Sequence, residues 1–277
     1  MRRRTFLAAT AAVISATARA QARPLRVVLL PFTDTMALMR MYQPLRSALG
    51  ARLGRPVELF TAADFSAHFA DIRKGDFDLA ITGPHFGAWA VEHGHRPVLR
   101  YKPTLRPLVV VRKDSGITDV SALRGRVVAL SNRLSVSSIA GEAWLASMGL
   151  RAGRDYRLQV SPTHTTAIMA VALGEVDAAI TTHTPIRQAP EDVRGRLATI
   201  ESPAGVPHLF TIANAAMPAA EAAAVRQALL DFAATAEGKA FLADSGYQDY
   251  VDITAADVAA MAPVIEVLTA ILAEEGA

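Results

Sequence analysis

Two stretches of this 277-residue chain repeat one another: GDFDLAIT at residues 75–82 and GEVDAAIT at residues 174–181. Each follows an amphipathic segment, begins with glycine and continues into a short apolar run, which is typical of a helix end followed by a buried strand. A shift of 99 residues extends the match without a gap to residues 54–82 against 153–181, where eight of 29 positions are identical. The repeat indicates two similar α/β units, although helix–glycine–strand units also recur within one α/β domain.

The alternation continues on both sides of the repeat. From Leu25 onward, short β-branched or apolar runs alternate with amphipathic segments, which predicts an α/β fold with a largely parallel sheet. The expected strands cover residues 25–30, 57–61, 77–81, 108–112, 126–130, 158–160, 178–181 and 209–213. The expected helices begin near residues 34, 64, 84, 137, 165, 218 and 254. Pro44 is expected to break or kink the first of these helices.

The composition excludes several classes of protein. The chain has no cysteine, so disulfide scaffolds, thiol nucleophiles and zinc–cysteine sites are excluded. Its formal charge is +3, but the first twenty residues hold four arginines and no acid; the remainder has 25 basic and 26 acidic side chains, a charge of −1. The composition therefore gives no support for a nucleic-acid partner or an anionic membrane surface.

Residues 1–20 are typical of an export signal peptide. Three arginines at positions 2–4 precede an apolar run that ends in the small-residue pattern ARA at 18–20. The run is too short to span a bilayer. RRTFL at 3–7 is similar to a twin-arginine signal, while the Sec route stays open. No later stretch is expected to be apolar enough for a membrane anchor, so we expect a periplasmic protein with no membrane insertion after signal removal.

A serine-rich turn is the first candidate ligand site. Ser135, Val136, Ser137 and Ser138 follow an expected strand and stand at the start of an expected helix. At a helix start, free backbone N–H groups and the positive end of the dipole suit a tetrahedral oxyanion. Serines at this position also serve simply as helix caps. The turn therefore predicts an anion site if other residues converge on it.

The repeat adds residues from the other unit. Phe65 and His164 occupy equivalent positions, each in the first turn of a helix that follows a strand. Ligands of open α/β sheets gather at the carboxyl ends of strands, so the two residues are expected to face one cleft from opposite walls. His85 follows Gly83-Pro84 directly after another strand end. It is expected to reach the same cleft, the alternative being a solvated helix start.

In order and spacing, these motifs resemble the phosphate/phosphite/phosphonate-binding periplasmic proteins of ABC transporters. The resemblance rests on GDFDLAITGP at 75–84, the Asp64-Phe65 helix start, the serine turn, and the run from Thr163 to Asp177. It implies a two-lobed type 2 periplasmic binding protein, in which each lobe is a mixed sheet flanked by helices and two crossover strands join the lobes. Lobe 1 then comprises residues 24–111 plus 203–277, and lobe 2 comprises residues 112–202.

The resemblance also implies site residues. The family's serine–threonine–serine turn falls on Ser135, Val136 and Ser137, its histidine on His164, and an aromatic residue of lobe 1 on Phe65. Val136 replaces a hydroxyl residue and offers only its backbone N–H. Phe65 stands where a tyrosine is usual, so it forms a wall without a hydroxyl donor.

The implied function is capture of a small phosphorus oxyanion for an ABC permease, with no bond made or broken and no cofactor or metal. Thr184 and the neighbourhood of His208 and Leu209 occupy the regions where some relatives carry acids that bind an ammonium group, which argues against an aminophosphonate ligand. Phosphite, a simple alkyl phosphonate, phosphate or another small oxyanion stays open. Two alternatives stay open: docking of the liganded protein on a periplasmic sensor domain, and a serine hydrolase that uses Ser137 and His164. Common hydrolase, nucleotide-binding and zinc-protease motifs are absent from the sequence, so an enzyme is not expected.

Overall fold

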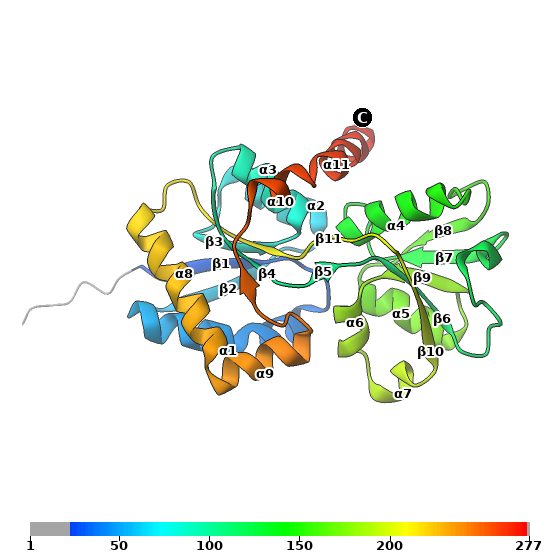
Figure 1. The fold of residues 1–277 in the computed structure, drawn as a ribbon, viewed down its shortest axis with the longest axis horizontal. Helices are drawn as coiled ribbons and strands as arrows, with labels where there is room; N and C mark the ends of the chain where they lie inside the picture. Colours follow the sequence, from blue (N-terminus) through cyan, green and yellow to red (C-terminus); the bar gives the residue numbers. More distant parts are fainter. Residues whose placement is uncertain (1–22, 276–277) are drawn as a thin grey trace, which may run out of the picture.

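A computed structural model describes residues 23–275, and the expected export signal at residues 1–20 lies outside them. The chain folds into two α/β lobes that lie side by side and are joined by extended segments (Figure 1). Each lobe has its own sheet with helices on both faces. The structure thus confirms the predicted two-lobed α/β fold.

Lobe 1 is built on a six-stranded mixed sheet. In spatial order its strands are β13 (Tyr250–Val251), β4 (Arg96–Tyr101), β12 (Phe210–Ala213), β3 (Leu79–Thr82), β1 (Leu25–Leu29) and β2 (Val57–Thr61). β1 pairs in parallel with β2 and β3, while β12 runs antiparallel to β3 and β4. Its helices are α1 (Thr35–Leu53), α2 (Phe65–Lys74), α3 (Pro84–Glu92), α8 (Ala219–Ala234), α9 (Ala236–Ser245), α10 (Ala255–Ala259) and α11 (Ala262–Glu275).

Lobe 2 repeats this plan on a five-stranded sheet. In spatial order its strands are β10 (Leu197–Glu201), β6 (Leu108–Arg112), β9 (Ala178–Thr181), β7 (Val127–Leu130) and β8 (Arg157–Val160). β7 is parallel to β8 and β9, and β6 is antiparallel to β9 and β10. A short 3-10 helix (Val120–Leu123) and the helices α4 (Val136–Ser147), α5 (His164–Leu173), α6 (His183–Gln188) and α7 (Glu191–Arg194) complete the lobe.

The two connections between the lobes pair with each other. β5 (Thr104–Leu105) and β11 (Val206–Pro207) form a two-stranded antiparallel sheet between the larger sheets (Figure 1). The expected boundary after Val111 falls inside β6, because that strand is hydrogen-bonded on both sides within the sheet of lobe 2. The first crossing therefore lies before Leu108.

The sequence repeat corresponds to a repeat in the structure. α2 and α5 end at Gly75 and Gly174, whose φ angles of 68° and 76° lie in the left-handed region that favours glycine. Three residues later, Asp78 and Asp177 each accept a hydrogen bond from a backbone N–H of the adjacent parallel strand, at 2.7 and 2.8 Å. The same interactions thus fix the same strand–helix–strand unit in both lobes.

Pro44 does not break α1, which runs from Thr35 to Leu53 with the proline inside it. The helix buries Leu38, Tyr42, Leu45 and Leu49 at a spacing of three or four residues. Burial of such side chains contributes about 1.5–3 kcal/mol each, which offsets the cost of one proline in a helix, about 3 kcal/mol. Packing of the buried side chains of α1 therefore outweighs the helix-breaking tendency of Pro44.

Several elements were not expected from the sequence. They include β4, β10, β13, α6, α7, α9 and α11. In β4, Arg96, Pro97 and Arg100 interrupt the apolar pattern. β4 is nevertheless held between β12 and β13. Its pairing, rather than its own composition, makes it a strand.

The C-terminal segment corrects the expectation that no later stretch would be apolar enough for a membrane span. Residues Ala255–Glu274 reach a mean hydropathy of 1.8 and are long enough to cross a bilayer by composition alone. In the fold this segment is divided into α10 and α11, and α11 contacts α3 of lobe 1 and α4 of lobe 2. Val264, Leu268 and Ile271 form its buried stripe, so packing accounts for part of its apolar character.

Gly141 provides a test of how α4 is seated on the sheet of lobe 2. A Cβ atom at this position would lie 2.5 Å from Cγ2 of Ile180, a buried side chain on β9. Gly141→Ala should therefore destabilise the protein by about 1–3 kcal/mol, although alanine is the better helix former by about 1 kcal/mol. Urea unfolding measures the change, with Ser147→Ala on the exposed face of α4 as the control. A gain in stability for Gly141→Ala would contradict this packing.

Candidate functional site

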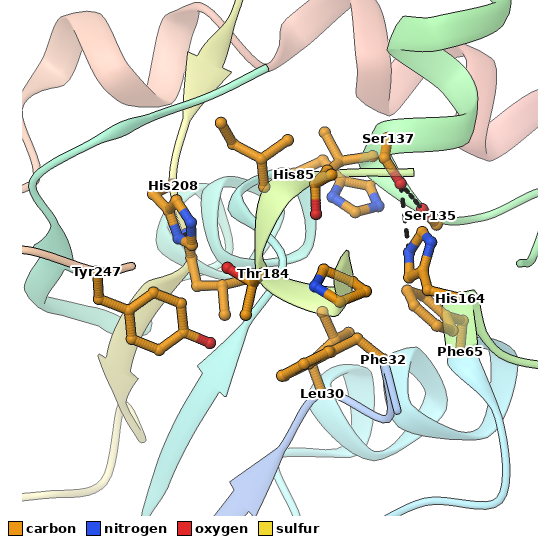
Figure 2. A pocket seen from close by; sticks show the side chains of 15 residues that line it. Leu30, Phe32, Phe65, His85, Ser135, Ser137, His164, Thr184, His208 and Tyr247 are labelled. Atoms are coloured by element: carbon orange, nitrogen blue, oxygen red, sulfur yellow. Dashed lines mark hydrogen bonds between the residues drawn. The ribbon is translucent and has the colours of Figure 1, made fainter. Parts of the chain in front are cut away.

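A small cavity lies where the two lobes meet, at the carboxyl ends of β1, β3, β7 and β9 (Figure 2). Its volume is about 40 Å³, enough for about three water molecules. Residues of both lobes and of the crossing segments line it: Leu30, Phe32, Phe65, His85, Leu105, Ser135, Val136, Ser137, His164, Thr182, Thr184, Pro185, His208, Leu209 and Tyr247. Six of the seven expected site residues are therefore brought together.

The serine turn begins α4 and presents its polar groups to the cavity. Ser135 caps the helix, its Oγ accepting from the Ser138 N–H at 3.4 Å and lying 2.6 Å from Oγ of Ser137. The backbone N–H groups of Val136 and Ser137 lie in the first turn, where a helix supplies no acceptor for them. Ser138 is fully buried but does not line the cavity. The turn thus combines helix capping with free donors, so the two expected roles are compatible.

His164 is the first residue of α5 and lies beside the serine turn (Figure 2). Its Nε2 is 3.0 Å from Oγ of Ser131 and 3.4 Å from Oγ of Ser137, and its Nδ1 is 3.1 Å from Oγ1 of Thr181. Burial lowers the pKa of His164 to about 4. The imidazole is therefore neutral at pH 7, and all three of its partners are hydroxyl groups.

Phe65 and His85 come from lobe 1. Phe65 begins α2 and is 2% exposed, and its ring forms an apolar part of the cavity wall. His85 is the second residue of α3 and stacks on Phe86, with ring centroids 3.9 Å apart. Its Nε2 lies 2.8 Å from the carbonyl oxygen of Leu134, so this nitrogen is the donor. Burial lowers the pKa of His85 to about 4.

The His85–Leu134 hydrogen bond joins the two lobes, and it is accompanied by others. Thr184 of lobe 2 donates to the carbonyl oxygen of Ser245 in lobe 1 at 3.0 Å. Oγ1 of Thr33 and Oγ1 of Thr165 are 3.1 Å apart across the interface. These contacts require the lobes to be together. The structure is therefore a closed arrangement of the two lobes.

The electrostatic character of the cavity comes from the backbone. Four helices, α2, α3, α4 and α5, begin at its wall with Phe65, Pro84, Val136 and His164. Helix N-termini carry a partial positive charge and unpaired N–H groups. Among the described residues, no lysine, arginine, aspartate or glutamate lines the cavity. It is therefore a neutral site whose dipoles favour an anion.

Sequence reasoning missed part of the wall. Leu30 and Thr182 directly follow β1 and β9, so the rule that ligands gather at strand ends could have found them. Tyr247 follows α9 in a segment far along the chain and carries no such signal. Thr184 and His208 line the cavity as neutral groups, in the regions where the resemblance implies acids in some relatives.

Among residues 23–275, no carboxylate is hydrogen-bonded to His164 beside Ser137. In a serine hydrolase a third group, usually a carboxylate, orients the histidine. Here that position is taken by the hydroxyl of Thr181. Within residues 23–275, no group of three or more His, Asp or Glu side chains is arranged to hold a metal ion.

Residues 27–258 match the family of phosphonate periplasmic substrate-binding proteins of ABC transporters. The chain belongs to this family. Members are substrate-binding components of transporters rather than enzymes, and they are periplasmic. The match covers most of the described chain, including the serine turn and both copies of the repeat.

Solved structures share the fold at low sequence identity. A binding-protein component of an ABC phosphonate transporter from Pseudomonas aeruginosa has a TM-score of 0.75 and 17% identity over 91% of this chain and 96% of that chain. PhnD1 from Prochlorococcus marinus, in complex with methylphosphonate, has a TM-score of 0.76 and 15% identity over 89% and 97%. XAC2383 from Xanthomonas citri, bound to chloride ion, has a TM-score of 0.69 and 17% identity over 90% and 99%. These similarities show the type 2 periplasmic binding protein fold.

The neutral histidines predict how stability depends on pH. His164 and His85 titrate near pH 4 in the folded protein, against 6.5 for an unperturbed histidine, and burial lowers the pKa of His68 to about 3. Because the unfolded chain binds protons more readily, stability is full above about pH 6.5 and falls as the pH drops toward 4. The free energy of unfolding should fall by about 2 kcal/mol or more between pH 7 and pH 5, as measured by urea denaturation.

Two variants test whether the buried histidines cause this dependence of stability on pH. His68→Gln, in α2 behind the cavity, removes one buried imidazole and should make the pH profile shallower, whereas substitution of the exposed His93 by Gln should leave the slope unchanged. A wild-type profile that is flat between pH 7 and pH 5 would show that these histidines are not held neutral.

Proposed function

We propose that this protein captures a small phosphorus oxyanion (phosphite, a simple alkyl phosphonate or phosphate) between its lobes and delivers it to an ABC permease in the periplasm. The observation that carries the proposal is the convergence of the serine turn, His164 and four helix N-termini on one neutral cavity. Family membership supports transport over docking on a sensor domain. The methylphosphonate complex of PhnD1 supports a ligand of this size.

The hydrogen-bond donors of the serine turn are sufficient for micromolar affinity for an oxyanion. The hydroxyls of Ser135 and Ser137 and the N–H groups of Val136 and Ser137 lie within one turn of chain. A hydrogen bond to a charged acceptor contributes about 1.5–3 kcal/mol. The Ser135–Ser137 hydrogen bond uses one of the two hydroxyl hydrogens, so three donors remain for the anion. Together they contribute about 4.5–9 kcal/mol, which is enough for about micromolar binding, near −8 kcal/mol. Phe65 contributes by excluding water on the side of lobe 1.

Ligand binding is coupled to closure because the cavity is completed by both lobes. The anion donors lie on lobe 2, whereas Phe65, His85 and Leu30 of lobe 1 form the facing wall. An anion on the serine turn gains the second set of contacts only when the lobes meet. It therefore binds the closed arrangement more tightly and shifts the equilibrium toward it.

The dimensions and chemistry of the wall restrict the ligand. A volume of about 40 Å³ suits a tetrahedral group with a small substituent. An ammonium group would meet Thr184, His208 and apolar side chains, with no carboxylate to pair with among the lining residues. Methylphosphonate and phosphite are therefore expected to bind more tightly than 2-aminoethylphosphonate.

Titration calorimetry of the exported form tests the proposal. Phosphite or methylphosphonate should bind with micromolar affinity, and Ser137→Ala should weaken binding about 10- to 100-fold because one charge-assisted hydrogen bond is lost. Ser147→Ala, on the same helix but exposed at its far end, is the matched control and should bind as the wild type does. Absence of binding by phosphite, methylphosphonate and phosphate would defeat the proposed ligand class.

A further inference from the structure

A second and larger pocket adjoins the anion cavity. It lies between the crossing segment around β5, helix α6 of lobe 2 and the residues that follow α9 of lobe 1, and its volume is about 480 Å³. It shares Leu105, Thr182, Thr184 and His208 with the cavity. The rest of this outer pocket, unlike the cavity, is mainly polar and charged, and includes Arg106, His183, Arg187, Glu201 and Gln248.

The cavity opens at the wall that it shares with the outer pocket. Of the residues that line the cavity, all are buried except Thr182, which is partly exposed and lines both spaces. His208, another shared residue, lies across the cavity from the serine turn (Figure 2). A phosphonate whose oxygens accept hydrogen bonds from the serine turn has its P–C bond directed away from those donors. Its substituent therefore points toward the opening and the outer pocket.

Two arginines give the outer pocket a positive charge. Arg106 directly follows β5, and Arg187 lies in the last turn of α6. Both are exposed, and within residues 23–275 neither forms an ion pair with an acidic side chain. Arg187 crosses to lobe 1, where a Cβ atom at Gly246 would lie 3.0 Å from its Nε. Guanidinium N–H donors are thus available at the side of the pocket where the lobes meet.

The one acidic residue of the outer pocket already has a partner. Oε1 of Glu201 is 3.3 Å from Nε2 of His183, and both residues line the pocket. Two guanidinium groups and one carboxylate leave the wall with a net positive charge. A negatively charged group is therefore favoured here over an ammonium group, and the planar donor pairs of arginine suit a carboxylate.

We propose that this protein captures alkyl phosphonates whose substituent ends in a carboxylate, with the phosphonate on the serine turn and the carboxylate paired with Arg106 and Arg187. This inference rests on the proposed function and adds the chemical class of the substituent to it. The cavity holds the phosphonate group, and the outer pocket holds the second anionic group. Phosphite and methylphosphonate occupy the cavity alone.

Titration calorimetry with three phosphonates of matched length tests this assignment. 3-Phosphonopropionate, propylphosphonate and 2-aminoethylphosphonate share the same P–CH₂–CH₂ unit and end in a carboxylate, a methyl group and an ammonium group. Near neutral pH and at low salt, 3-phosphonopropionate should bind about 3- to 10-fold more tightly than propylphosphonate, because the charge-assisted contact is made by exposed arginines. 2-Aminoethylphosphonate should bind more weakly than propylphosphonate, because its ammonium group faces like charges.

Two variants remove the positive charges one at a time. Arg187→Gln and Arg106→Gln should each reduce the ratio of the affinities for 3-phosphonopropionate and propylphosphonate toward one. Arg157→Gln is the matched control: it makes the same change of net charge on the exposed edge strand β8, outside both pockets, and should keep the wild-type ratio. The readout compares two ligands on one protein, so the folded fraction of a variant does not affect it.

The outcomes separate this inference from the proposed function. If the wild type binds 3-phosphonopropionate no more tightly than propylphosphonate, or binds 2-aminoethylphosphonate most tightly, the carboxylate site is overturned while oxyanion capture stands. An equal loss of affinity for all ligands in both arginine variants would assign the arginines to closure or to long-range attraction, and would overturn the site equally. Absence of binding by phosphite and by all three phosphonates would remove the proposed function itself.

Discussion

The proposed function depends on a single electrostatic constraint: a negative charge is to be held away from water without a cationic side chain. The cavity wall contains histidines that burial keeps neutral, hydroxyl groups, and apolar side chains. The compensating positive potential comes from helix starts, which a parallel strand–helix arrangement places at one edge of each sheet. Ser135 and Ser137 add short, neutral donors at the start of α4. Under the proposed function, such a site holds an anion while it adds no charge of its own.

This constraint explains why the molecule has two lobes. One sheet presents helix starts on one side of a ligand only, whereas two facing sheets enclose it. The paired β5 and β11 join the lobes while leaving their sheets separate, and the hydrogen bonds from His85 to Leu134 and from Thr184 to Ser245 hold them together. These hydrogen bonds are accompanied by packing of α11 against α4, so closure of the lobes combines polar and apolar contacts. The same closure that traps the ligand also keeps the histidines dry and neutral.

The sequence revealed the parts of this design that are local. Gly75, Gly174 and the apolar runs after them are readable because left-handed helix ends and buried strands impose residue types directly. Phe65 and His164 were placed correctly because the repeat transfers register from one lobe to the other. The sequence did not predict three features: the continuous helix through Pro44, the strand β4, and the contribution of Tyr247 to the cavity. They depend on strand pairing and packing between residues that are far apart in the sequence, so no short stretch of sequence indicates them.

The most direct measurement is a crystal structure of the protein grown with methylphosphonate. The anion should lie between the lobes, with its oxygens within hydrogen-bond distance of Ser135, Ser137 and the Val136 N–H, and with no lysine or arginine in contact with it. An anion held by an arginine, or bound outside the space between the serine turn and Phe65, would contradict the view that helix starts and neutral donors are sufficient.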